Sequence, residues 1–116
     1  MTDRNPQTIS VCEATALLTE GALLVDVREA SERSETIHGA LHVPMSRIDE
    51  APLPATQRPV IFHCRSGRRT AMNSDILNAK AGDAPVYLME GGIEAWVAAG
   101  LPVKPGAGSR PPLDQV

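Results

Sequence analysis

One short segment of the sequence, HCRSGRRT at residues 63–70, places a thiol among three guanidinium groups. Arg65, Arg68 and Arg69 all lie within five positions of Cys64. Like charges so close together repel one another, so this clustering does not serve stability. Cations do favour the thiolate over the thiol, and the thiolate is the form of cysteine that acts as a nucleophile. The segment therefore predicts a nucleophilic sulfur that acts on an anionic substrate.

The residues around Cys64 predict a strand, a tight loop and a helix. Residues 59–63 form an apolar run typical of a buried strand, and residues 70–81 have a helical composition. Free N–H groups and the dipole at the start of that helix favour an anion such as a thiolate. Ser66 and Gly67 allow the backbone to turn tightly, so that successive N–H groups can point inward and bind an anion.

A structural cysteine beside a solvated arginine face is the competing interpretation of this segment. It is the weaker one, because inert cysteines rarely lie in electropositive surroundings at the end of a strand. Cys12 receives the opposite interpretation, since its neighbours are Glu13 and apolar residues. We therefore expect Cys12 to be structural.

Other segments predict strands and helices in alternation. Ser10 and Glu13 form a capping box that opens a helix ending near Gly21. The apolar run at 22–27 has the pattern of a strand that is covered on both faces, and residues 85–89 predict another strand.

The helix over 70–81 has poor apolar periodicity. Met72 and Ile76 share one face, whereas Leu77 lies nearly opposite, which predicts a helix buried on two sides. Ile93 and Trp96 begin a clearer apolar stripe on a short helix near the C-terminus.

This alternation predicts an α/β fold with a mostly parallel central sheet flanked by helices. Functional sites in such sheets form at the carboxyl ends of strands, where both Cys64 and the segment 26–28 lie. We expect an N-terminal arm over 1–8, one domain over 9–103 and a Pro- and Gly-rich tail over 104–116.

The composition limits the classes of function. A chain of 116 residues with 42% hydrophobic content fits one globular domain. The net charge of -3 gives no reason to expect a nucleic-acid or membrane partner. Two cysteines are too few for a disulfide framework, and the sequence shows no signal-peptide pattern, so we expect a cytoplasmic protein.

Four segments, in order along residues 9–103, resemble the single-domain rhodaneses, sulfurtransferases that carry sulfur as a cysteine persulfide. DVRE at 26–29, IHGALHVP at 37–44, CRSGRRT at 64–70 and GGIEAWVAAGLPV at 91–103 are similar to that family's motifs. Thr36 and His38 depart from the second motif, where histidine and proline are common. Both departures lie outside the cysteine loop.

The resemblance implies roles for individual residues. Cys64 would be the catalytic nucleophile, and the five residues that follow it would bind the substrate (Arg65, Ser66, Gly67, Arg68 and Arg69). Their backbone N–H groups would cradle the transferred sulfur, with Arg69 closing the six-residue loop. Asp26 and Arg28 would lie at the same edge of the sheet as a second layer of the site, and we expect a structural ion pair for Arg28 and Glu29.

The resemblance also implies the substrates. The donor would be a small anion such as thiosulfate, and the acceptor would be cyanide or a thiol. A sulfur-relay protein is a further candidate partner. No cofactor or metal is required.

Three other functions compete with sulfur transfer as interpretations of the sequence. Phosphatases and arsenate reductases with the pattern C-x5-R are disfavoured, because Arg69 lies at C-x4-R and Thr70 stands at the C-x5-R position. A rhodanese-like module that only binds a partner typically lacks the cysteine. A metal site from His38, His42, His63 and Cys64 is disfavoured, because Gly39 and Pro44 break the helical spacing that a histidine pair would need.

Overall fold

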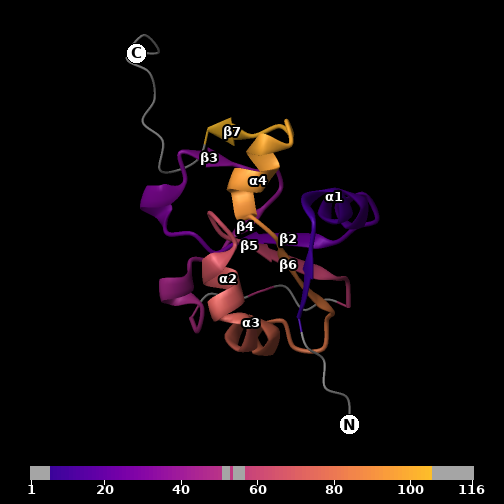
Figure 1. Cartoon of the computed structure of the whole chain (residues 1–116). Coiled ribbons are helices and arrows are strands. Elements are labelled where there is room, and N and C mark those ends of the chain that lie inside the picture. Colours follow the sequence, from indigo (N-terminus) through magenta and orange to yellow (C-terminus); the bar gives the residue numbers. More distant parts are fainter. Residues whose placement is uncertain (1–5, 51–52, 54–56, 106–116) are drawn as a thin grey trace.

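A five-stranded sheet forms the centre of the molecule (Figure 1). The computed structural model describes residues 6–50, 53 and 57–105. Every neighbouring pair of strands in this sheet is parallel. The order across the sheet is β1 (Gln7–Ile9), β6 (Val86–Met89), β5 (Val60–His63), β2 (Leu23–Asp26) and β4 (Leu41–His42). The predicted α/β fold with a mostly parallel sheet is confirmed.

Helices cover both faces of the sheet. Figure 1 shows α1 (Val11–Thr19) and α4 (Gly92–Ala98) on one side, and α2 (Arg68–Met72) and α3 (Ser74–Lys80) on the other. Two short 3-10 helices, η1 (Ala30–Glu32) and η2 (Met45–Arg47), lie in the connections that follow β2 and β4.

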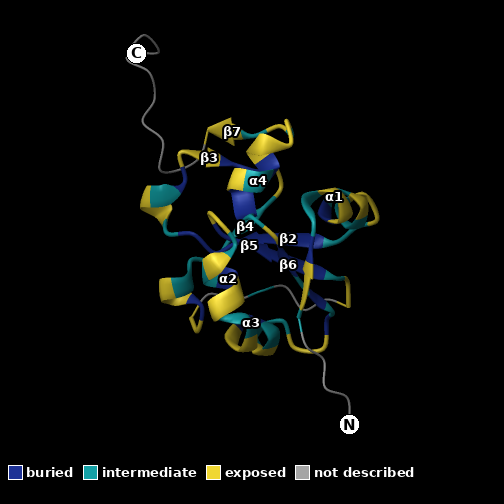
Figure 2. Cartoon of the chain, viewed as in Figure 1, coloured by how far each residue is buried: buried dark blue, intermediate teal, exposed yellow. Residues whose placement is uncertain are grey.

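The core is divided between the two faces in the way that alternating strand residues require. Leu24 and Ile61 pack with Trp96 of α4 in one apolar cluster. Their chain neighbours Val25 and Phe62 belong to the other apolar cluster. Because both faces are covered, the central strands are buried along their whole length (Figure 2). This explains why their sequences are continuous apolar runs.

The start of α1 agrees with the sequence prediction. The backbone N–H of Glu13 donates to Ser10 Oγ at 3.0 Å, and the Glu13 carboxylate accepts from the Ser10 N–H at 2.8 Å. The capping box is therefore confirmed.

The helix after the cysteine loop differs from the prediction. It begins at Arg68 and is interrupted at Asn73, whose side-chain amide donates to the Arg69 carbonyl at 2.8 Å. Only its Leu77 side is buried, whereas Met72 and Ile76 are 77% and 45% exposed. The prediction of burial on two sides is wrong, because only one side of α3 faces the sheet.

Two terminal segments also belong to sheets. Gln7 and Thr8, which we assigned to an N-terminal arm, pair with Tyr87 and Leu88 in β1 and β6. The first residues of the expected tail form β7 (Lys104–Pro105), which pairs antiparallel with β3 (Glu35–Thr36). The rest of the expected arm and tail, apart from Pro6, lies outside the described residues. Among the helices that the structure describes, none is long and apolar enough to span a bilayer.

Candidate active site

Cys64 lies at the carboxyl end of β5, immediately after a fully buried strand. Its neighbour His63 is level with Asp26 at the end of β2 in the parallel register. The connection to α2 then begins, and Gly67 caps that helix with a φ of 92°. A glycine adopts this left-handed conformation at no steric cost, which permits the tight turn. The structure thus places Cys64 in the strand, loop and helix arrangement that the sequence predicts.

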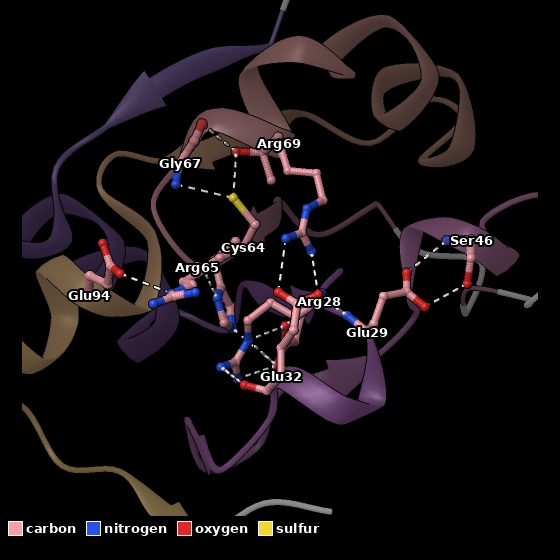
Figure 3. A network of polar contacts seen from close by, with 12 residues as sticks. Arg28, Glu29, Glu32, Ser46, Cys64, Arg65, Gly67, Arg69 and Glu94 are labelled. Carbon is pink, nitrogen blue, oxygen red and sulfur yellow. Dashed lines mark hydrogen bonds and ion pairs between the residues drawn. The ribbon is translucent and has the colours of Figure 1, made fainter. Parts of the chain in front are cut away.

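The sulfur atom of Cys64 is buried and has polar partners. The backbone N–H of Gly67 donates to Sγ at 3.1 Å, and the hydroxyl of Thr70 lies 3.8 Å from it (Figure 3). The Thr70 hydroxyl is also 3.2 Å from the Gly67 carbonyl, so its single proton has two possible acceptors. A negative charge on sulfur would draw that proton toward itself. Both contacts therefore stabilise a thiolate.

The loop is held in shape by the first turn of α4. Ile93 and Glu94 donate their backbone N–H groups to the carbonyl groups of Cys64 and Arg65, at 2.9 and 3.1 Å. In a trans peptide the N–H points opposite to the C=O. The N–H groups that follow these two carbonyls therefore point away from α4.

Gly92 makes this close approach possible. A Cβ atom at this position would lie 2.4 Å from the Cys64 carbonyl oxygen and 2.5 Å from that of Arg65. Only glycine fits between the loop and the helix without displacing one of them.

The three arginines of the loop differ in their partners. Arg69 makes two hydrogen bonds to Glu32 of η1, at 2.9 and 3.2 Å. Arg65 pairs with Glu94 of α4 at 3.1 Å (Figure 3). Arg68 is exposed and has no ion-pair partner within the described part of the chain. The predicted cluster of positive charge is therefore balanced at two of its three positions.

Each member of the pair formed by Glu32 and Arg69 changes the ionisation of the other. The hydrogen bonds from Arg69 hold the pKa of Glu32 below its ordinary value, despite partial burial that opposes this. The same bonds raise the pKa of Arg69, and the nearby Cys64 adds to that effect. Both side chains therefore remain charged at neutral pH.

Asp26 lies behind the loop as the buried acceptor of two arginines. Its carboxylate accepts hydrogen bonds from Arg28 at 2.8 and 3.0 Å and from Arg33 at 3.0 Å. Arg28 in turn donates to the carbonyl groups of Glu32 and Glu35, at 3.1 and 2.8 Å. Burial alone would raise the pKa of Asp26, but the hydrogen bonds from Arg28 bring it to about 2.

His63 fills the space between this network and the loop. Its Nδ1 lies 3.1 Å from the Cys64 carbonyl, which can only accept, so Nδ1 carries the proton. Nε2 lies 3.9 Å from Asp26 Oδ2 and has no hydrogen-bond partner in the part of the chain that the structure describes. Burial lowers the pKa of His63, so the ring is neutral at physiological pH.

The expected ion pair of Arg28 with Glu29 does not form. Arg28 pairs with Asp26, and Glu29 instead accepts hydrogen bonds from the backbone and hydroxyl of Ser46 at 3.1 and 2.7 Å. Arg28 turns toward the buried carboxylate because a charge without a partner in the core would be costly.

Two cavities meet beside the loop. The first, of about 530 Å³, is lined by Cys64, the three arginines, Ser66 and Glu94, among others. The second, of about 550 Å³, shares Arg65 and Glu94 with the first and extends along η1 and α4. No group of three or more side chains suited to a metal ion occurs within the described ranges.

The structure thus brings Cys64, the five loop residues, Asp26 and Arg28 to one edge of the sheet. The sequence prediction missed Glu32 and Glu94, the carboxylates that pair with the loop arginines. Glu94 lies within the motif at 91–103 and close to its glycines, which is a signal that could have found it. Glu32 carries no such signal, because only the path of the chain after β2 brings it to Arg69.

Comparison with known proteins places these features in context. Residues 10–99 match the family model of the rhodanese-like domain. A sulfurtransferase of Allochromatium vinosum is 38% identical over 90 residues, covering 73% of this chain and 80% of that protein. Thiosulfate sulfurtransferase GlpE of Actinobacillus succinogenes is 35% identical over 95 residues, covering 80% and 85%. An uncharacterized protein of Synechocystis is 35% identical over 85 residues, covering 72% of this chain but only 47% of its own length.

Solved structures show the same architecture. A thiosulfate sulfurtransferase from Pseudomonas aeruginosa superposes with a TM-score of 0.76 at 28% identity, covering 94% of this chain and 22% of that one. A protein from Rhodopseudomonas palustris, described as a possible tyrosine phosphatase, gives 0.70 at 26% identity, covering 85% of each chain. A rhodanese-related protein from Thermoplasma volcanium gives 0.73 at 24% identity, covering 84% and 97%.

Proposed function

Because the chain belongs to the rhodanese-like family, we propose that it is a sulfurtransferase that moves sulfane sulfur from a donor to a thiophilic acceptor through a persulfide on Cys64. The observation that carries this proposal is the hydrogen bond from the Gly67 N–H to Sγ at 3.1 Å, inside a loop that three arginines surround. A thiolate held this way is an activated nucleophile. Names of two relatives, a sulfurtransferase and a thiosulfate sulfurtransferase, support the same reaction class.

The reaction proceeds as a double displacement. The Cys64 thiolate attacks the outer sulfur of thiosulfate, a new S–S bond forms, and the bond to the inner sulfur breaks. Its electron pair leaves with sulfite. The outer sulfur, now negatively charged on Cys64, takes the position that N–H groups of the loop can stabilise. Cyanide or a thiolate then attacks this sulfur and releases the Cys64 thiolate.

A direct test follows the sulfur itself. After incubation with thiosulfate, intact-mass measurement should show the gain of one sulfur atom per chain, and cyanide should remove it. Cys64→Ser should abolish the gain. Cys12→Ser is the matched control, because Cys12 is exposed on α1 and we expect it to carry no sulfur.

The outcome that contradicts this proposal is equally specific. Loss of loading in Cys12→Ser, with the fold retained, would move the carrier role away from Cys64. A folded parent that loads no sulfur from any donor would instead favour a module that only binds a partner.

A further inference from the structure

The charges at the mouth of the site are distributed in an unexpected way for a pocket that binds a dianion. Two of the three loop arginines are paired with carboxylates of the protein itself, which leaves Arg68 as the guanidinium without an ion-pair partner among the described residues. A free cation of this kind balances one negative charge on a ligand. Thiosulfate carries two.

A ligand can reach the ion pair of Arg65 with Glu94 and compete for either side chain. The ion pair of Arg69 with Glu32 is more enclosed. The Arg65 and Glu94 side chains are 69% and 56% exposed, against 33% and 26% for Arg69 and Glu32. Glu94 also lines the cavity that contains Cys64. An anion entering that cavity therefore meets the Glu94 carboxylate, and it must compete with Glu94 for Arg65.

The second cavity provides room for an organic group. It meets the cysteine cavity at Arg65 and Glu94, and Ile93 and Val97 give it an apolar wall. Its volume of about 550 Å³ is in the range of pockets that hold small organic molecules.

From these observations we propose that Glu94 is a specificity-determining residue, which disfavours dianionic donors and directs the site toward organic sulfane-sulfur donors of single charge. Organic persulfides, as the anion R–S–S⁻ that exchanges with R–S–SH, and thiosulfonate anions such as methanethiosulfonate are such donors. This inference rests on the sulfur transfer proposed above and names its donor class.

The transfer from an organic persulfide balances without an oxidant or a reductant. The Cys64 thiolate attacks the outer sulfur of R–S–SH, and a bond forms between Sγ and that sulfur. The original S–S bond breaks, and its electron pair leaves on the inner sulfur. The resulting RS⁻ takes the proton that the outer sulfur carried and departs as the thiol RSH, which leaves the persulfide anion on Cys64.

Anion binding can be measured without any turnover. Iodoacetamide is neutral and alkylates Cys64, and a bound anion should slow that alkylation. Sulfate serves as the dianion and methanesulfonate as the monoanion, both at low ionic strength because salt screens exposed charges. In Glu94→Gln, the sulfate concentration that gives half-protection should fall about two- to fivefold, the range for an exposed ion pair.

Glu94→Gln should lower the concentration for half-protection by a different factor for each of the two anions. Coulomb energy scales with the product of the charges, so the free-energy gain for sulfate should be twice that for methanesulfonate. The factor for sulfate should therefore be about the square of the factor for methanesulfonate. Glu94→Lys changes the local charge by two units instead of one. It should therefore enlarge the factors for both anions, and the factor for sulfate should remain the larger.

Turnover gives the second measurement. Thiosulfate and methanethiosulfonate offer the same kind of outer sulfur with two charges and one. Glu94→Gln should raise kcat/KM for thiosulfate more than for methanethiosulfonate, through a lower KM. Glu50→Gln is the matched control, since Glu50 also belongs to an exposed pair, with Arg47 at 3.3 Å, but does not line either cavity.

Two results would overturn the inference. Equal responses of sulfate and methanesulfonate would exclude selection by charge. Weaker protection by sulfate in both Glu94 variants would mean that Glu94 holds Arg65 in place for the anion. A parent that shows the expected protection but transfers no sulfur would instead contradict the proposed function, so the two failures can be told apart.

Discussion

Arg28 and Arg69 connect the cysteine loop to the buried carboxylate of Asp26 through a chain of hydrogen bonds and ion pairs. Arg69 is tied to Glu32, and the carbonyl of Glu32 is tied to Arg28, which is anchored on the buried Asp26. The helix η1 is thus fixed from both sides. The Glu32 carboxylate can orient Arg69 only because Asp26, through Arg28, holds η1 in position.

Asp26 should accordingly be critical for stability. In Asp26→Asn two buried arginines lose their charged acceptor, which for buried pairs costs about 3–5 kcal/mol of the free energy of unfolding. Urea denaturation at neutral pH measures this loss. Asp49→Asn is the control, because Asp49 is exposed and should change stability little. Equal stability of the two variants would contradict the role assigned to Asp26.

The ionisation of Asp26 should also make the free energy of unfolding depend on pH in the acid range. The pKa of Asp26 is about 2 in the folded chain, below the ordinary value of 3.8. The unfolded chain therefore binds a proton at a higher pH than the folded chain does, so this stabilisation is complete above pH 3.8 and is lost as the pH falls toward 2. The shift corresponds to about 2 kcal/mol. Denaturation between pH 5 and pH 2, followed as about a dozen urea curves, should show a smaller acid-dependent loss in Asp26→Asn than in the parent.

At the scale of elements, the contact between the loop and α4 decides the shape of the site. The amides at the start of α4 hold the Cys64 and Arg65 carbonyls, and Gly92 permits the approach. The motif containing Gly91 and Gly92 is therefore a support for the cysteine loop, although it lies almost thirty residues further along the chain.

Gly92→Ala should damage function beyond its effect on stability. Its Cβ would lie only 2.4 Å from the Cys64 carbonyl oxygen, so the loop must move. Displacement of a reacting group by about 1 Å can lower turnover roughly 100-fold. We expect a loss of that order in kcat, measured together with the thermal unfolding midpoint.

Gly100→Ala is the control that distinguishes backbone strain at a positive φ from displacement of the cysteine loop. Gly100 also has a positive φ, of 79°, but a Cβ there meets nothing within 4 Å. Both variants should lose about 1–2 kcal/mol from the left-handed backbone. Only Gly92→Ala should lose turnover; a similar loss in Gly100→Ala would indicate that backbone strain alone affects the site.

The elements themselves could be predicted to different degrees. The strands that end at Asp26 and His63 were predictable, because burial on both faces leaves a continuous apolar run. The interruption at Asn73 was not, since it depends on a side-chain hydrogen bond that competes with the helix. β1 was missed because three residues with one buried side chain carry almost no periodic signal.

For the whole molecule, the sequence predicted the edge of the sheet where the site forms but not the balance of charge there. Local spacing identifies Cys64 and its arginines, which are neighbours in the chain. The carboxylates that neutralise two of them come from segments 37 and 29 residues away. Such pairing depends on the path of the chain around the sheet, which a run of residue types does not specify.

The fold alone does not separate sulfur transfer from phosphate chemistry, because structures described as thiosulfate sulfurtransferase and as possible tyrosine phosphatase both resemble this chain. The length of the loop favours sulfur transfer. At the C-x5-R position stands Thr70, which is buried and whose hydroxyl lies 3.8 Å from Sγ. Arg69, one residue earlier, is engaged by Glu32.

We therefore expect no appreciable hydrolysis of an aryl phosphate such as p-nitrophenyl phosphate by a preparation that transfers sulfur to cyanide. The physical reason is that phosphate transfer requires cationic groups aimed at the phosphoryl oxygens, and the uncharged Thr70 stands at the position that arginine takes in enzymes with the C-x5-R pattern. Release of nitrophenolate and formation of thiocyanate can be followed on the same sample. Cys64→Ser, purified in the same way, controls for contaminating phosphatases. Nitrophenolate release at a rate comparable to thiocyanate formation, and absent in Cys64→Ser, would place the loop in phosphate chemistry despite its length.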